Sequence, residues 1–456
     1  MPRPYLLIPL LIPILLGGCT SYRPLPLPGE SAKAPPLERI TVDTRSLPFP
    51  ALAAHGFDAS DGLDQLEAAI LAVANNPDLK LARDDAAIVR AQSFAAGLLP
   101  DPQLALSGDL SNTQGPGSTR AYSAGLSYDF NALLTHSSVV RAGRADVRKT
   151  DLGLLWQEWQ VASQAELLHV KLRYERKQLA VLADTETLFT DRVGRMRAAL
   201  AQGLLATDAM LPNLTALQDV QRQRFELERQ ARQDAYDMNT LLGLGAGTTL
   251  RLQDSPAQTA PSQAEVDAAE AGLAQRRPDL LALQAGYTAQ DARYRGAILA
   301  QFPALNIGLT RARDSSNVYS KAVGITLTLP FLNRNRGNIA IENATRQRLH
   351  DEYQQRLRAA HDELVRIPDL LRRNSAALVQ ANASVAELSV LLERSKVAYR
   401  AGNVDMLVYA NARAALLAKQ LEQIALRQAV AEQQVALRTL LGLDPSNPSL
   451  SRKLHE

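Results

Sequence analysis

The residues best able to do chemistry in this chain are one cysteine and six histidines. Cys19 is the only cysteine among 456 residues, so no disulfide can form within the chain. The histidines are scattered and lack the spacing of a metal site. They are His55, His136, His169, His350, His361 and His455. No Ser/His/Asp set or Gly-rich phosphate loop is present, so the sequence predicts no enzyme and no resident metal or cofactor.

The position of Cys19 indicates a different chemistry, the attachment of lipid to its sulfur. Arg3 precedes an apolar stretch from Tyr5 to Leu16, which is too short to cross a bilayer as a helix. The stretch ends in Leu16-Gly17-Gly18-Cys19, which resembles a bacterial lipoprotein signal cleaved before Cys19. The alternative is a plain secretory signal with an incidental cysteine. The residue after Cys19 is Thr20 and not Asp. The resemblance to Gram-negative lipoproteins then implies sorting to the outer membrane.

The composition indicates long helices and no polyanionic partner. Aromatic residues are 5% of the chain, and Ala, Leu, Gln and Arg dominate. The formal net charge is +3, with no Lys/Arg-rich run, which argues against nucleic-acid binding.

Two halves of the chain repeat the same short motifs. Pro77-Asp78-Leu79 returns as Pro278-Asp279-Leu280 (278 − 77 = 201), and Gly203 returns as Gly402 (402 − 203 = 199). Repetition over this length predicts a tandem duplication of one large unit. We therefore divide the chain into five segments. They are a signal peptide at 1–18, a Pro-rich extended tether at 19–60, repeats at 61–251 and 262–443, and a tail at 444–456.

Each repeat predicts the same order of elements. A helix with a break at Pro77 or Pro278 comes first, at about 61–99 and 263–299. Two strands with period-2 alternation follow in each half, near 104–130 and 305–329. A helix of some 65 residues comes next, at about 136–201 and 337–401, and then a final helix at about 207–242 and 405–441. We expect Pro368 to kink the second long helix, where the first has His169.

Four short strands cannot close a membrane barrel alone, because small barrels start at about eight strands. An open edge in lipid would leave backbone groups unpaired at a cost of several kcal/mol each. Three chains would supply twelve strands, and their long helices would pack as coiled coils, which we judge too polar to cross a membrane themselves. The alternative is a soluble helical protein with two hairpins.

The chain resembles the TolC family of outer-membrane efflux factors over about residues 61–443. The matching motifs are Arg277–Leu280, Phe302–Leu305, Tyr399–Leu407 and Leu440–Gly442. The resemblance implies an α+β membrane fold: a homotrimer with a 12-stranded β-barrel, four strands per chain, and a long periplasmic α-helical tunnel. It also implies a passive exit channel that works with a periplasmic adaptor and an inner-membrane pump. The lipobox and Pro-rich tail fit the lipoprotein branch, and Leu329–Gly337 resembles the CzcC-like branch that exports heavy metals.

The resemblance also points to functional residues at the periplasmic tip. Gly203 and Gly402 fall at the two helix-helix turns, where an adaptor would dock, and Arg197 and Arg400 lie in the preceding helical turns. Capping of the helices is the alternative role.

By register with the family, Leu407 falls at an apolar constriction and Asn411 where an aspartate ring often sits. Asp405 could supply charge near that level, and ordinary packing is the alternative role of Leu407. Other classes consistent with the sequence are a type I protein-secretion channel and a structural lipoprotein or adhesin. The sequence names neither the exported substrate nor the pump and adaptor.

Overall fold

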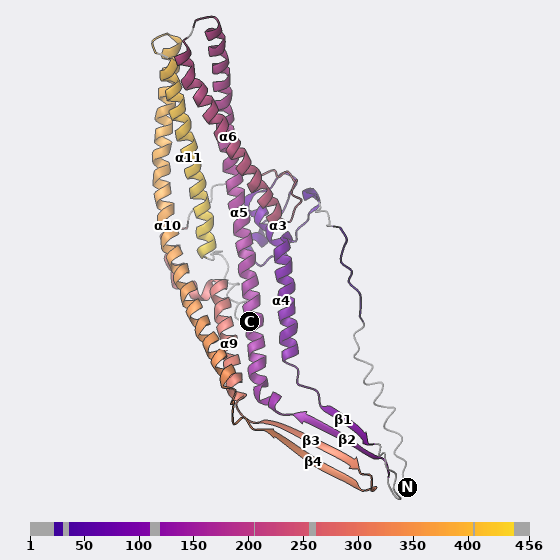
Figure 1. Cartoon of the computed structure of the whole chain (residues 1–456). Coiled ribbons are helices and arrows are strands. Elements are labelled where there is room, and N and C mark those ends of the chain that lie inside the picture. Colours follow the sequence, from indigo (N-terminus) through magenta and orange to yellow (C-terminus); the bar gives the residue numbers. More distant parts are fainter. Residues whose placement is uncertain are drawn as a thin grey trace.

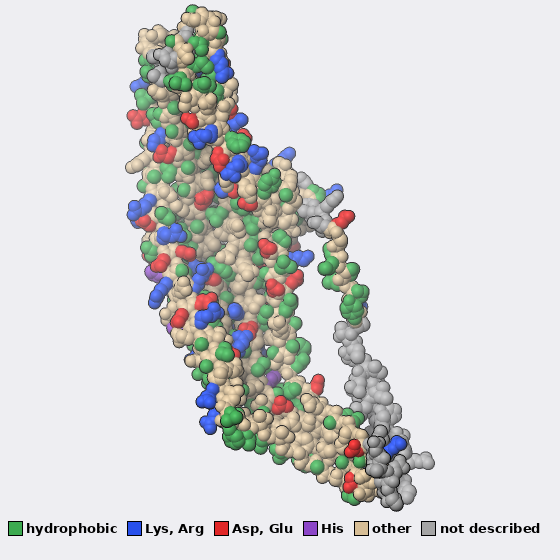
Figure 2. All heavy atoms as spheres, viewed as in Figure 1, with side chains coloured by type: hydrophobic (Ala, Val, Ile, Leu, Met, Phe, Trp, Pro, Cys, Tyr) green, Lys and Arg blue, Asp and Glu red, His purple; other side chains and the backbone are tan. Residues whose placement is uncertain are grey.

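A long helical body with a small sheet at one end makes up the structure, a computed structural model (Figure 1). The structure describes residues 22–30, 36–109, 119–204, 206–254, 261–404 and 406–441. Cys19 and the tail at 444–456 therefore lie outside the described residues. Acidic and basic side chains are spread over the helical body (Figure 2).

The same order of elements occurs in both halves of the chain. The first half contains α3 (Gln65–Asn75), α4 (Pro77–Ala96), β1 (Gln103–Asp109), β2 (Ala121–Asp129), α5 (Asn131–Ala201) and α6 (Thr207–Leu241). The second contains α7 (Gln263–Ala271), α8 (Leu273–Arg276), α9 (Pro278–Leu299), β3 (Ala304–Arg313), β4 (Tyr319–Thr328), α10 (Arg336–Arg400) and α11 (Met406–Leu441). Pro77 and Pro278 each begin a new helix, as predicted, because proline fits the first helical turn.

The predicted long helices are present and pack along one another. At ~1.5 Å per residue, α5 with 71 residues is about 105 Å long. Pro368 lies inside α10, which continues through it. α10 packs against α11 and α9, and α5 against α6, α9 and α11. The helices of the two halves therefore form one body.

One finding differs from the expectation that the long helices are too polar to cross a membrane. Of the described helices, α10 contains an 18-residue stretch that is apolar enough by length and composition, and 11% of that stretch is buried. α10 also exposes Val379, Val390 and Val397. Within one chain, this helix therefore leaves part of its apolar surface uncovered.

The prediction of an extended tether over residues 19–60 is wrong for residues 37–54. Three short helices, η1 (Leu37–Arg39), η2 (Thr44–Ser46) and α2 (Pro50–Ala54), follow residue 36. Leu37, Phe49 and Leu52 are buried against α3 and α5, and Phe49 meets Trp159 edge to face. Burial of these apolar side chains makes residues 37–54 part of the body.

The four strands form one antiparallel sheet in the order β1-β2-β3-β4. Leu104, Leu126, Leu309 and Val323 lie in one row across all four strands and are each more than half exposed. The opposite face carries small and polar residues, such as Ser107 and Ser123, whose hydroxyls are 2.8 Å apart. The sheet thus has an uncovered apolar face and, within the described residues of this chain, two outer strands with one neighbour each.

Candidate functional site

The two predicted helix-helix turns lie together at the end of the body farthest from the sheet (Figure 1). One joins α5 to α6 and the other joins α10 to α11. The sequence places Gly203 and Gly402 at equivalent positions, and the structure brings them to the same end.

The two turns share one hydrogen-bond pattern. Gly203 N–H donates to the Leu200 carbonyl over 3.0 Å, and Leu204 N–H donates to the Ala199 carbonyl over 2.9 Å. The second turn repeats this, with Gly402 donating to Tyr399 over 3.0 Å and Asn403 to Ala398 over 2.9 Å. This is the Schellman ending, whose left-handed residue is usually glycine. The backbone φ is 70° at Gly203 and 75° at Gly402.

The space above both glycines is open. A Cβ atom built at Gly203 or Gly402 would meet nothing within 4 Å. Arg197 and Arg400 are exposed on the adjoining helical turns, and Leu204 is exposed beside Gly203. The two turns therefore present backbone, cations and an apolar side chain to a partner.

The predicted constriction residues are only partly described. Leu407 lies in the first turn of α11, but its side chain and all of Asp405 are outside the described residues. Asn411 is exposed one helical turn further along α11. Their roles remain predictions.

A buried arginine near the tip was not anticipated from the sequence. The Arg192 guanidinium of α5 lies 5.6 Å from the Phe189 ring centroid and 4.9 Å from that of Tyr409 in α11. Tyr409 stacks on Tyr399 of α10, with ring centroids 5.9 Å apart. Arg192 also donates to the Asn213 side chain of α6 over 3.4 Å. One cation therefore links the helices of both halves near the tip.

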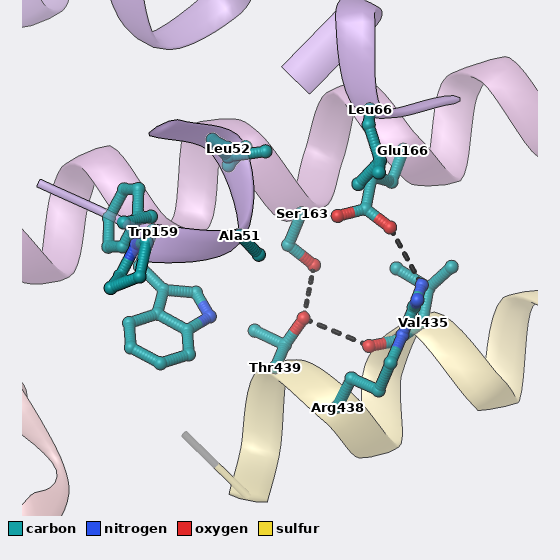
Figure 3. Close-up of a pocket in the computed structure, with 12 residues that line it drawn as sticks. Ala51, Leu52, Leu66, Trp159, Ser163, Glu166, Val435, Arg438 and Thr439 are labelled. Atoms are coloured by element: carbon teal, nitrogen blue, oxygen red, sulfur yellow. Dashed lines mark hydrogen bonds and ion pairs between the residues drawn. The ribbon is translucent and has the colours of Figure 1, made fainter. Parts of the chain in front are cut away.

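A second polar link joins the halves at mid-height, around a pocket beside α2 (Figure 3). Arg438 of α11 donates to Glu166 of α5 over 2.7 Å, and the hydroxyls of Thr439 and Ser163 are also 2.7 Å apart. Burial raises the pKa of Glu166, and the charge of Arg438 opposes that rise. These polar groups pair across the contact between α5 and α11.

Two further buried ionisable groups lie along α5. Burial and a hydrogen bond to Asp234 raise the pKa of Glu175 to about 8. Burial lowers the pKa of His169 to about 4, and its Nε2 lies 3.1 Å from the Leu63 carbonyl oxygen. His169 is therefore neutral at neutral pH and packs in the core. Within the described ranges, no group of three or more His, Cys, Asp or Glu side chains could hold a metal ion.

Comparison with known proteins identifies relatives of the chain. Residues 271–443 match the family described as "Outer membrane efflux protein". "Cation efflux system protein CusC" of Escherichia coli (strain K12) is 25% identical over 177 residues, which are 37% of this chain and 39% of CusC. The alignment thus spans about two fifths of the curated relatives' length.

Solved structures share the fold over most of the chain. The Campylobacter jejuni CmeC outer membrane channel has a TM-score of 0.70 at 15% identity, covering 96% of this chain and 98% of CmeC. The outer-membrane channel OprN has a TM-score of 0.71 at 17% identity, covering 93% of this chain and 99% of OprN. A CusC structure has a TM-score of 0.66 at 20% identity, covering 90% of this chain and 99% of that one. At these identities the likeness establishes the fold.

Proposed function

We propose, for this member of the outer membrane efflux protein family, the role of passive outer-membrane exit channel in a tripartite efflux system. The observation that carries the proposal is the sheet, with its apolar row from Leu104 to Val323 uncovered and its outer strands β1 and β4 each paired on one side. Such a sheet is stable in lipid only when its edges are paired by further strands. Three copies in a ring supply those strands, and the apolar faces then contact lipid.

The helical body would then continue the channel into the periplasm. The α5–α6 turn with Gly203 and the α10–α11 turn with Gly402 lie at the end opposite the sheet (Figure 1), where they can meet a periplasmic adaptor joined to an inner-membrane pump. The exposed valines of α10 would be covered by helices of a neighbouring copy. Lipid on Cys19 would add an anchor to the same membrane.

In the proposed system the pump and adaptor deliver the substrate to the channel. The CusC relative is described as a cation efflux protein, and its likeness supports metal ions as cargo, with small toxic compounds as the second candidate. Leu407 and Asn411 are proposed to narrow the channel near the tip, with Asp405 supplying charge. Loss of the Leu407 side chain in Leu407→Ala should then raise the resting conductance.

Three experiments test this role. Purified protein in a planar bilayer should conduct ions as a trimer, and cross-linking between β1 and β4 of neighbouring copies should yield a covalent trimer. Protease cleavage within residues 22–30 should leave the body in the membrane. Release of the body by that cleavage would support a structural lipoprotein or adhesin and refute the proposed channel role.

A further inference from the structure

Two basic side chains oppose each other on the apolar face of the sheet. Arg311 of β3 and Lys321 of β4 are direct partners in the antiparallel register, and both are exposed. Arg313 lies on the same face one row nearer the hairpin end, between Tyr122 and Tyr319. Like charges directly opposite on one face destabilise a sheet. We call Arg311, Arg313 and Lys321 the cationic rim.

The acidic residues near the hairpin end of the described sheet do not compensate this charge from the same face. Asp109 at the end of β1 pairs with Ala121, so its side chain points to the polar face. Asp314 accepts the backbone N–H groups of Ser316 and Val318 within the hairpin turn. The sequence of residues 110–118, the other hairpin connection, contains no acidic residue. An anion from outside the chain would therefore stabilise the rim.

The surroundings of the rim combine apolar and cationic groups. A surface depression is lined by Leu126, Leu309 and Val323 together with Arg311 and Lys321. The Arg313 guanidinium lies 5.1 Å from the centroid of the Tyr122 ring and donates to the Arg120 carbonyl over 2.7 Å. A ligand that fits this surface has an alkyl portion next to a negatively charged group.

The rim also lies at a definite depth. β4 has ten residues (Tyr319–Thr328), which is about 33 Å of extended chain, and Lys321 lies two residues from its hairpin end. A strand tilted by ~45° spans a hydrocarbon layer of about 25 Å with that length. Tyr128, Phe130 and Phe331 lie toward the helical body, whereas the rim lies toward the free hairpins (Figure 1). The rim thus sits at the headgroup level of the leaflet away from the helices.

We infer that the cationic rim binds the phosphorylated headgroup of an outer-leaflet lipid, with the alkyl chains lying on the row of Leu126, Leu309 and Val323. The inference rests on the proposed membrane-embedded sheet. Phosphate between Arg311 and Lys321 neutralises their repulsion, and the arginine fork suits phosphate oxygens. Binding of the lipid therefore stabilises the sheet at its outer end.

Retention of a phosphorylated lipid by the full-length protein tests the inference. The probes are bisphosphorylated lipid A and its dephosphorylated form, each in phosphatidylcholine nanodiscs. We expect the wild type to retain the phosphorylated form, and Arg311→Gln/Lys321→Gln to bind it about 30-fold more weakly, the loss expected for two basic residues at a lipid surface. Arg222→Gln/Arg232→Gln removes the same charge from exposed sites on α6 and should bind like the wild type. Lys321→Arg should also retain the lipid.

Thermal unfolding distinguishes a lost site from a damaged sheet. Without phosphorylated lipid, Arg311→Gln/Lys321→Gln should be at least as stable as the wild type, because the repulsion is gone. With lipid A, only the wild type should gain stability, and millimolar inorganic phosphate should not replace the lipid.

Equal retention of both lipid A forms, or equal retention by the double variant, would overturn the inference. If the wild type inserts into phosphatidylcholine vesicles but binds both forms of lipid A equally, the channel proposal stands and the proposed lipid site is refuted. Failure to insert into any vesicle refutes both.

Discussion

Replacement of Gly402 can separate a helix cap from a docking surface. Its φ of 75° costs an alanine about 1–2 kcal/mol. No atom lies within 4 Å of the added Cβ, so no clash within the chain adds to this cost. Asparagine adopts left-handed backbone more readily than alanine, although its side chain is larger. Gly402→Ala should therefore strain the backbone more, whereas Gly402→Asn should obstruct a docked adaptor more.

Amide hydrogen exchange measures the strain directly. The N–H groups of residues 402 and 403 donate to Tyr399 and Ala398, and their protection reports local opening of the turn. A cost of 1–2 kcal/mol predicts that Gly402→Ala lowers this protection by about 5- to 30-fold. Gly402→Asn should lower it less.

Adaptor-dependent export should be impaired more by Gly402→Asn than by Gly402→Ala, the reverse of their order in amide protection. A partner seated on the open glycine tolerates one methyl group better than an amide, so export should fall from wild type to Gly402→Ala to Gly402→Asn. Gly194→Ala is the matched control, since it lies in α5 near the tip with open space at its Cβ and an ordinary φ. This variant should preserve export and slightly increase the protection of the neighbouring α5 amides from hydrogen exchange. Export that follows the exchange ranking, with alanine worse than asparagine, would show that the turns are caps only.

Three other predictions follow from buried contacts. Gly243→Ala should lower the free energy of unfolding by more than about 3 kcal/mol, measured by thermal or denaturant unfolding. The reason is that φ is 65° and the new Cβ would lie 2.4 Å from the Asn75 carbonyl oxygen. A decrease in the free energy of unfolding of only about 1 kcal/mol would contradict this. The pKa of Glu175 is raised to about 8, so the native state keeps a proton that the unfolded chain releases above pH ~4.5. Its contribution to stability is therefore present below that pH and is lost as the pH rises to about 8. Glu175→Gln should flatten this part of the pH–stability curve, and an unchanged curve would refute it. Arg192→Met should keep the buried volume but lose the contact with Tyr409, which should speed the exchange of amides at the start of α11 by roughly 3- to 30-fold. Unchanged exchange there would show that Arg192 does not stabilise the contact between the halves near the tip.

The ends of the elements were largely predictable because local residues determine them. Pro77 and Pro278 begin helices wherever they stand, and Gly203 and Gly402 supply the left-handed residue that each Schellman ending needs. The alternation in the strands likewise located the sheet and its apolar face.

Features that depend on distant partners were not predictable in the same way. The proline content of residues 19–60 suggested a tether, whereas Leu37, Phe49 and Leu52 find a surface to bury against only after α3 and α5 have packed. Arg192 resembles any other arginine of a long helix. Its one local signal was its place between Phe189 and Val193, both of which are buried.

The contact around Glu166 has a consequence for how the chain reaches its native state. Arg438 and Thr439 meet α5 from 272 and 276 residues away in sequence, and α2 packs beside the same stretch of α5. Contacts of such long range form late, since the entropy of closing the loop must be overcome first. The part of α5 that Arg438 and Thr439 contact therefore stays uncovered until nearly the whole polypeptide has been made. A chain truncated before α11 would expose it permanently, which makes such fragments prone to aggregation and to capture by chaperones.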